Sequence, residues 1–347
     1  MQRIILHIGH HKTGTSALQS FLARNAAALR AQDVYYPDNP GNATAAQNKI
    51  SIGNITPTGD WLNDQVVANA LQAPDASTVV YSCEALCLMI ADKIEEIARL
   101  KDHVDITLVL VVRDVFEQLQ SVYQQVVKRA GYFGELSDLA MATSSIEIAA
   151  DIVRKCQDFG VAINVLNYST HKHDIIEQVL RTFPNGDALV AALAGLDKSA
   201  IVNRSMTFSE LNLLSEINRL GETNLGMLVS DRLVNELPDI TPELVPVDPA
   251  TCEILVERLG ESVRYINGFL PTTDQLTLEY AADIDAGPAF TGAHFSAAQL
   301  RIIAECMHEV SNTQMPPALP SVEKPGPRRR VKRAIKRFFG LNKRQTS

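Results

Sequence analysis

The chain has 347 residues, is 46% hydrophobic and carries a formal net charge of −8, which is typical of a soluble globular protein with one large core or two modest ones. Its five cysteines lack C-x-x-C spacing, which disfavours a disulfide framework and a thiolate metal site. Because we find no secretory signal and no run of 18 apolar residues, we expect a cytoplasmic protein.

The first predicted element is a buried strand, and the loop after it has the features of an anion site. The apolar run 3–8 leads into GHHKTGTS, and an amphipathic helix follows. Backbone N–H groups at a helix N-terminus favour an anion, and the loop adds Lys12 among hydroxyl side chains. A Walker-type loop, G-x-x-x-x-G-K-[ST], places its lysine directly after the glycine, whereas Lys12 precedes Gly14 by two residues. The loop therefore predicts an anion site of a different kind.

Continuous apolar runs separated by helix-length segments predict a parallel sheet that is buried on both faces. The runs cover residues 3–8, 77–82, 105–112 and 161–166. Helices are expected after the first loop, before the third strand (94–100) and after it (114–129). We expect a three-layer, P-loop-like α/β fold that binds ligands at the carboxyl ends of the strands.

Two further parts of the chain have a distinct pattern. Residues 37–74 have weak periodicity and are too long for an ordinary connection, so we expect a functional insertion near the mouth of the site. The C-terminal part is mostly helical. Its predicted helices cover 207–220, 249–269 and 296–311. We expect one α/β domain over residues 1–316, then a Pro-rich linker and basic tail over 317–347.

The tail carries charge opposite to that of the rest of the chain. Residues 323–347 hold ten lysines and arginines against one glutamate, so the preceding part is strongly acidic. Apolar residues near helical spacing would give a short amphipathic helix suited to an anionic lipid surface at the inner face of the membrane. A disordered, solvated tail is the alternative. Nucleic-acid binding is disfavoured because the acidic body would repel a polyphosphate.

A second anion-binding feature follows the third strand. Arg113 stands at the carboxyl end of this strand, and Ser121 lies eight residues further on, two turns into the next helix. A guanidinium and a hydroxyl that converge can hold a second phosphate by charge-assisted hydrogen bonds. Together with the first loop, this pair predicts a specific binding site for a ligand with two anionic groups.

These motifs resemble those of the sulfotransferases that use 3′-phosphoadenosine 5′-phosphosulfate (PAPS) as donor. The family's 5′-phosphosulfate loop reads like K-[ST]-G-T-[ST]-x-L, matched here by Lys12–Leu18. Its 3′-phosphate motif reads like R-x-P-x-x-x-x-x-S-x-Y, matched by Arg113, Ser121 and Tyr123. The loop is most similar to that of the bacterial branch that includes glycan and polysaccharide sulfotransferases. The likeness spans residues 1–270.

The resemblance implies a donor site and a reaction. Lys12 would stabilise charge on the bridging oxygen during an in-line displacement that depends on positioning and electrostatics and requires no metal. The product would be adenosine 3′,5′-bisphosphate, whose 3′-phosphate Arg113 and Ser121 would hold, although Val115 stands where the family usually has proline. The loop residues expected at the 5′-phosphate are Gly9, Lys12, Thr13, Gly14, Thr15 and Ser16.

The base that takes the acceptor's proton stays open among three residues. The bacterial branch tends to carry S-x-E near the end of the second core strand, matched here by Ser82–Glu84, so Glu84 is one candidate. Alternatively, its carboxylate complements the dipole of the helix that follows. His10 and His11 lie in the loop, where they would act as base or line the acceptor pocket. His7 is expected to face the core.

Two other segments are weaker candidates. Asn203–Ser205 match an N-x-S segment of the bacterial branch, so the resemblance implies that Arg204 closes over the nucleotide. His171 and His173 lack further convergent ligands, and we expect them in a solvated turn rather than in a metal site.

The leading expectation is a PAPS-dependent sulfotransferase acting on a hydroxyl or amine. The resemblance and the tail favour a carbohydrate or lipid-linked glycan as acceptor. A small-molecule kinase using ATP and Mg²⁺ is an alternative, which the missing G-K-[ST] and Walker-type aspartate disfavour. A non-catalytic protein that binds nucleotide or acidic lipid is a third possibility. The joint presence of Lys12, Glu84, Arg113 and Ser121 argues against it.

Overall fold

A computed structural model of the chain describes residues 2–47, 51–71, 76–198, 204–243, 245, 247–279 and 293–312. Its internal contacts divide the chain into two compact units, where the sequence predicted one domain before the tail. The first unit comprises Met1–Val115, Ser144–Ile201 and Arg258–Leu278. The second comprises Phe116–Thr143, Val202–Glu257 and Glu279–Ser347. The predicted linker and basic tail lie outside the described residues.

A five-stranded, entirely parallel sheet forms the centre of the first unit, with the strand order β2-β3-β1-β4-β5. The strands are β1 (Gln2–His7), β2 (Val34–Tyr35), β3 (Thr78–Ser82), β4 (Val104–Val112) and β5 (Ala162–Asn167). The four predicted runs are confirmed as β1, β3, β4 and β5. The two-residue edge strand β2 was not predicted, because so short a segment shows no periodicity.

The connections of the sheet reverse direction beside β1. After β1 the chain builds β2 and β3 on one side, and it then returns to add β4 and β5 on the other. His7, the last residue of β1, lies opposite Ser82 of β3 and Val109 of β4. Open α/β sheets bind ligands beyond the carboxyl ends of the strands at such a reversal. The topology therefore puts the loop after β1 at the expected position of a binding site.

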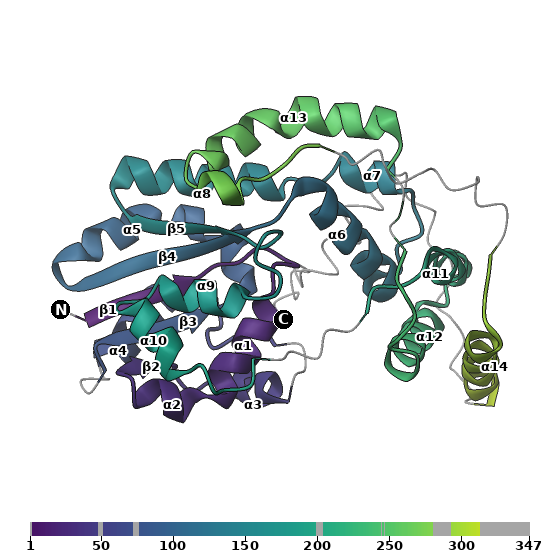
Figure 1. Ribbon diagram of the computed structural model, residues 1–347, viewed down its shortest axis with the longest axis horizontal. Coiled ribbons are helices and arrows are strands. Elements are labelled where there is room, and N and C mark those ends of the chain that lie inside the picture. Colours follow the sequence, from purple (N-terminus) through teal and green to yellow (C-terminus); the bar gives the residue numbers. More distant parts are fainter. Residues whose placement is uncertain are drawn as a thin grey trace. The chain divides into compact units, whose positions relative to one another are not determined.

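Helices cover both faces of this sheet, which confirms the predicted three-layer α/β fold (Figure 1). One face carries α1 (Thr15–Arg24), α2 (Ala26–Arg30), α9 (Ile175–Arg181) and α10 (Gly186–Ala192). The other carries α5 (Ile94–Arg99) and α8 (Ser145–Phe159). On the first face, Phe21 and Ile176 pack with Ile5 and Val109 of the strands in one buried cluster. Burial on both faces explains the unbroken apolar strands.

The segment between β2 and β3 packs against the end of β3. It contains α3 (Pro40–Ala46), a π-helix (Leu62–Val67) and α4 (Ala68–Leu71). The Asn54 side chain donates to the Val80 carbonyl at 2.9 Å and accepts from the Ser82 N–H at 2.8 Å. Gly53 has φ +97°, and a Cβ there would lie 1.7 Å from the Ser82 oxygen, so only glycine fits. This segment therefore lies against the carboxyl end of β3, and its predicted functional role near the mouth of a site stays a prediction.

The first unit also contains short 3₁₀ helices. They cover Glu84–Leu88, Ile90–Asp92, Leu100–Asp102 and Thr272–Asp274.

The second unit is helical, as predicted for the C-terminal part of the chain. Its helices are α6 (Val115–Ala130), α7 (Leu136–Ala140), α11 (Phe208–Leu220), α12 (Thr223–Glu236), the first part of α13 (Pro249–Asn267), and α14 (Ala297–Asn312). The boundary between the units falls within α6 and within α13. Among the described residues, no helix combines the length and the hydrophobicity needed to cross a bilayer.

Candidate functional site

The loop between β1 and α1 begins as an extension of the sheet and then turns sharply into the helix. The N–H groups of Ile8 and His10 donate to the carbonyls of Val109 and Val111 on β4, at 2.9 and 3.3 Å. The Thr13 hydroxyl then donates to the His10 carbonyl and closes the turn. The loop is thereby fixed to the carboxyl end of β4 before α1 starts.

Two residues of the turn have left-handed backbone conformations, Lys12 with φ +66° and Gly14 with φ +80°. This region is sparsely populated for a residue with a side chain, so Lys12 is held there by its surroundings. Its carbonyl accepts a 2.9 Å hydrogen bond from the Arg113 guanidinium. At Gly14, a Cβ would lie 2.9 Å from Cε2 of Tyr168, so both the backbone and the packing require glycine.

The N-terminus of α1 has the arrangement of an anion site. No side chain caps it, which is also true of α8 and α9, so the missing cap alone does not distinguish α1. The Thr15 hydroxyl is buried and has no hydrogen-bond partner within the described part of the chain, while Ser16 is exposed. A helix start without a side-chain cap, beside a buried hydroxyl that lacks a partner, suits a bound phosphate or sulfate oxygen. Binding of a 5′-phosphosulfate group by this loop stays a prediction.

Gly9 allows the close packing beneath this turn. A Cβ at Gly9 would lie 2.9 Å from His7 Nε2 and 3.0 Å from Thr13 Oγ1. Any larger residue would push the turn away from the end of β1. The predicted role of Gly9 in contacting a phosphate stays a prediction, whereas its packing role follows from these distances.

The structure brings Arg113 to the same loop. The guanidinium carbon lies 5.1 Å from the centre of the Tyr168 ring, in addition to the hydrogen bond to Lys12. The next residue, Asp114, receives an N–H from Thr277 and donates its own N–H to Ser169, at 3.1 and 3.0 Å. The end of β4 is therefore held by the loop after β5. Tyr168 was not predicted, because its contact with Arg113 joins parts of the chain that are distant in sequence.

Comparisons with family models, with curated proteins and with solved structures find no match. The function must therefore be argued from the residues and their geometry.

The His11 and Glu84 side chains meet beside the loop. Glu84 begins the 3₁₀ helix directly after β3, and its carboxylate pairs with Nδ1 of His11. Both side chains are partly accessible, with 15% of His11 and 26% of Glu84 exposed, but the Nε2 atom of His11 is itself buried. A carboxylate on Nδ1 favours the tautomer with its proton there. The structure thus joins two of the three candidate bases into one pair.

His10 has a different environment. Its side chain is 3% exposed, and Nε2 lacks a hydrogen-bond partner among the described residues. Burial, and to a lesser extent the charge of His11, lower the pKa of His10 to about 3. The imidazole is therefore neutral at neutral pH and a weak base.

His7 and His171 have structural contacts. His7 is buried as predicted, and its Nδ1 lies 2.9 Å from the Ser82 hydroxyl, while burial lowers its pKa to about 4. His171 contacts Asp174 and Asp274 through its two ring nitrogens, at 3.1 and 3.0 Å. Burial lowers the pKa of His171, but its hydrogen bonds to both carboxylates outweigh this effect and raise the pKa overall. No group of three or more potential metal ligands occurs among the described residues.

The remaining predicted site residues belong to the second unit. Ser121 is half-buried on α6, and Tyr123 packs edge-on against Tyr132 with ring centres 6.0 Å apart. Arg113 belongs to the first unit, and its predicted convergence with Ser121 stays a prediction.

Arg204 forms a buried ion pair within this unit. Its guanidinium donates to both carboxylate oxygens of Glu210, at 2.7 and 2.8 Å, and to the Leu237 and Leu233 carbonyls. The two side chains are only 6% and 0% exposed. Burial raises the pKa of Glu210, but hydrogen bonds from Arg204 and Gln299 outweigh it and lower the pKa. These contacts give Arg204 a structural function, and nucleotide binding by Arg204 stays a prediction. Asn203 lies outside the described residues.

Proposed function

We propose that this protein is a PAPS-dependent sulfotransferase that transfers a sulfuryl group to a hydroxyl or amine, with a carbohydrate as the favoured acceptor class. The observation that carries the proposal is the contact between the Arg113 guanidinium and the Lys12 carbonyl at the reversal point of the sheet. It joins the two motifs that resemble the family's donor-binding motifs, although they are about a hundred residues apart in sequence.

The β1–α1 turn supports a donor site. The N–H groups at the start of α1 and the Thr15 hydroxyl would hold the 5′-phosphate, and the Lys12 ammonium would stabilise the charge that develops on the bridging oxygen. The S–O bond to this oxygen breaks as the acceptor oxygen bonds to sulfur, and adenosine 3′,5′-bisphosphate leaves. Arg113 is half-buried and fixed by Tyr168, which suits a cation that binds the 3′-phosphate.

The His11–Glu84 pair supports proton removal from the acceptor. In this proposal the Glu84 carboxylate, which is the more exposed of the two side chains, takes the proton from the acceptor hydroxyl, and His11 Nδ1 holds this carboxylate in position. His10 is less suitable, because its pKa of about 3 makes it a weak base at neutral pH. The pair thus combines two of the candidates that the sequence left open.

A transfer assay tests the proposal. Purified protein is incubated with sulfur-labelled PAPS and a mixture of oligosaccharides, and labelled products are separated from the donor. We expect labelled saccharide from the wild type and a decrease of about 10²–10³-fold in kcat for Lys12→Ala, the loss typical when one charge-stabilising donor is removed. Arg3→Ala is a matched control, since Arg3 forms an exposed ion pair with Asp105. Activity that does not depend on Lys12 would contradict the proposed role of the loop.

The same preparation distinguishes a kinase. If the protein transferred phosphate from ATP in the presence of Mg²⁺ and showed no reaction with PAPS, the sulfotransferase proposal would be wrong and the loop would serve a nucleoside triphosphate.

A further inference from the structure

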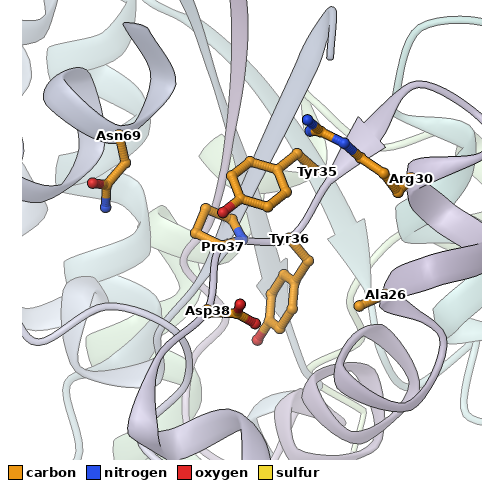
Figure 2. A pocket seen from close by; sticks show the side chains of 7 residues that line it. All are labelled: Ala26, Arg30, Tyr35, Tyr36, Pro37, Asp38 and Asn69. Atoms are coloured by element: carbon orange, nitrogen blue, oxygen red, sulfur yellow. The ribbon is translucent and has the colours of Figure 1, made fainter. Parts of the chain in front are cut away.

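A pocket of about 470 Å³ lies at the carboxyl end of the edge strand β2, within the first unit. Its lining comes from three segments: α2, the residues that end and follow β2, and α4 (Figure 2). The lining residues are Ala26, Arg30, Tyr35, Tyr36, Pro37, Asp38 and Asn69. Its volume falls within the range of about 300–1,000 Å³ usual for small-molecule sites. None of these residues belongs to the β1–α1 loop or to the His11–Glu84 pair.

We propose that this pocket binds one sugar ring of the acceptor. That the bound sugar is the acceptor rests on the proposed sulfotransferase function, whereas saccharide binding itself follows from the residues of the pocket.

The walls of the pocket combine aromatic surface with polar groups of both kinds. Tyr35 and Tyr36 supply two rings, and the Arg30 guanidinium lies 4.6 Å from the centre of the Tyr35 ring. Arg30 and Asn69 supply hydrogen-bond donors, and Asp38, which is exposed, supplies an acceptor. A sugar has an apolar ring face and hydroxyl groups that both donate and accept, so it matches this mixture. A polyanion would meet the Asp38 carboxylate, and a purely apolar ligand would leave the polar groups without partners.

Tyr36 forms a buried part of the pocket wall. Its side chain is 2% exposed, and its hydroxyl has no hydrogen-bond partner within the described ranges. Burial is the main cause that raises the pKa of this phenol, so the hydroxyl remains protonated.

The pocket and the proposed base are connected through β3. β2, which ends at the pocket, pairs with β3, and Cys83 directly follows β3. Cys83 directly precedes Glu84, the partner of His11. Both the pocket and this pair thus lie beyond the carboxyl ends of neighbouring strands, the edge where open α/β sheets bind their ligands. A π-helix, Leu62–Val67, immediately precedes α4 and Asn69, and such irregular turns are frequent at functional sites.

Saccharide binding can be measured without any donor. Saturation-transfer NMR and titration calorimetry would use the full chain with maltose, cellobiose, lactose and N-acetylglucosamine as probes. We expect millimolar or tighter binding of at least one probe, and a decrease in affinity of about tenfold or more for Asp38→Asn and for Tyr35→Ala. Tyr35→Phe keeps the ring and should bind nearly as well as the wild type. Asp64→Asn is the matched control, because Asp64 is an exposed carboxylate outside the pocket.

The outcomes separate this inference from the proposed function. If no probe binds, or if Asp38→Asn and Tyr35→Ala bind like the wild type, the assignment of the pocket is wrong. A protein that binds adenosine 3′,5′-bisphosphate but no saccharide overturns only the pocket assignment. A protein that binds saccharide through Asp38 but neither binds nor uses PAPS overturns only the sulfotransferase proposal.

Discussion

The burial of His7 and His10 predicts that the protein loses stability as the pH falls below about 6.5. Burial lowers the folded-state pKa values to about 4 and about 3, whereas the ordinary value is 6.5. As the pH falls, protons therefore bind these histidines in the unfolded chain before they bind them in the folded chain. Their contribution to the free energy of unfolding is complete above pH 6.5 and declines as the pH falls towards the folded-state pKa values. At pH 5, each histidine should cost about 2 kcal/mol relative to neutral pH, and the two together about 4 kcal/mol. This is a large part of the 5–15 kcal/mol typical of folded proteins.

Urea denaturation at pH 7.5 and pH 5.0 measures this effect. The quantity compared is the change in unfolding free energy between the two pH values. A loss of stability that a variant shows equally at both pH values therefore cancels. His7→Gln and His10→Gln should each reduce this change by about 2 kcal/mol. His171→Gln should increase it, because Asp274 and Asp174 raise the pKa of His171 and its charged form stabilises the folded state at low pH. If His7→Gln and His10→Gln leave the change as large as in the wild type, the burial argument is wrong.

Three substitutions test other parts of the account. Gly14→Ala should lower the free energy of unfolding by about 1–2 kcal/mol because of its left-handed backbone, and by a further amount because the new Cβ meets the Tyr168 ring. The control Gly59→Ala has φ +61° and no atom within 4 Å, so in urea denaturation it should lose only the backbone contribution. Equal losses of stability in the two variants would contradict the packing argument. Glu210→Gln should lower the free energy of unfolding by about 3–5 kcal/mol, because Arg204 then stays buried without its charged partner. Asp231 forms a more exposed ion pair with Arg129, so Asp231→Asn should cost about 1 kcal/mol or less in the same assay. Glu84→Gln should lower kcat by about 10²–10⁴-fold and leave the affinity for adenosine 3′,5′-bisphosphate, measured by calorimetry, unchanged. A parallel loss of this affinity would show that Glu84 holds the loop in place rather than taking part in proton transfer.

The sequence allowed most of the sheet to be predicted, and the reason is burial. Strands covered on both faces are continuous apolar runs, and such runs identified β1, β3, β4 and β5 to within one or two residues. The edge strand Val34–Tyr35 has only two residues, too few for any pattern. The boundary between the two compact units falls inside α6 and α13, where helical periodicity continues without interruption, so the sequence contains no signal for it.

The site could be predicted only where the sequence motif is local. Lys12 to Ser16 form one turn, so their joint position at the start of α1 follows from the strand-loop-helix pattern. The pairing of His11 with Glu84 and the stacking of Arg113 on Tyr168 join distant parts of the chain, and a single sequence contains no signal for either. The pocket at Tyr35–Asp38 likewise depends on how α2 and α4 pack beside β2.

The most direct measurement is calorimetric titration of the purified protein with adenosine 3′,5′-bisphosphate in EDTA, with Lys12→Ala and Arg113→Ala variants alongside. The account predicts micromolar binding by the wild type without any divalent cation, and a loss of affinity of at least tenfold for Arg113→Ala, since this residue is assigned to the 3′-phosphate. Absence of binding in EDTA, with ATP binding restored by Mg²⁺, would contradict the account.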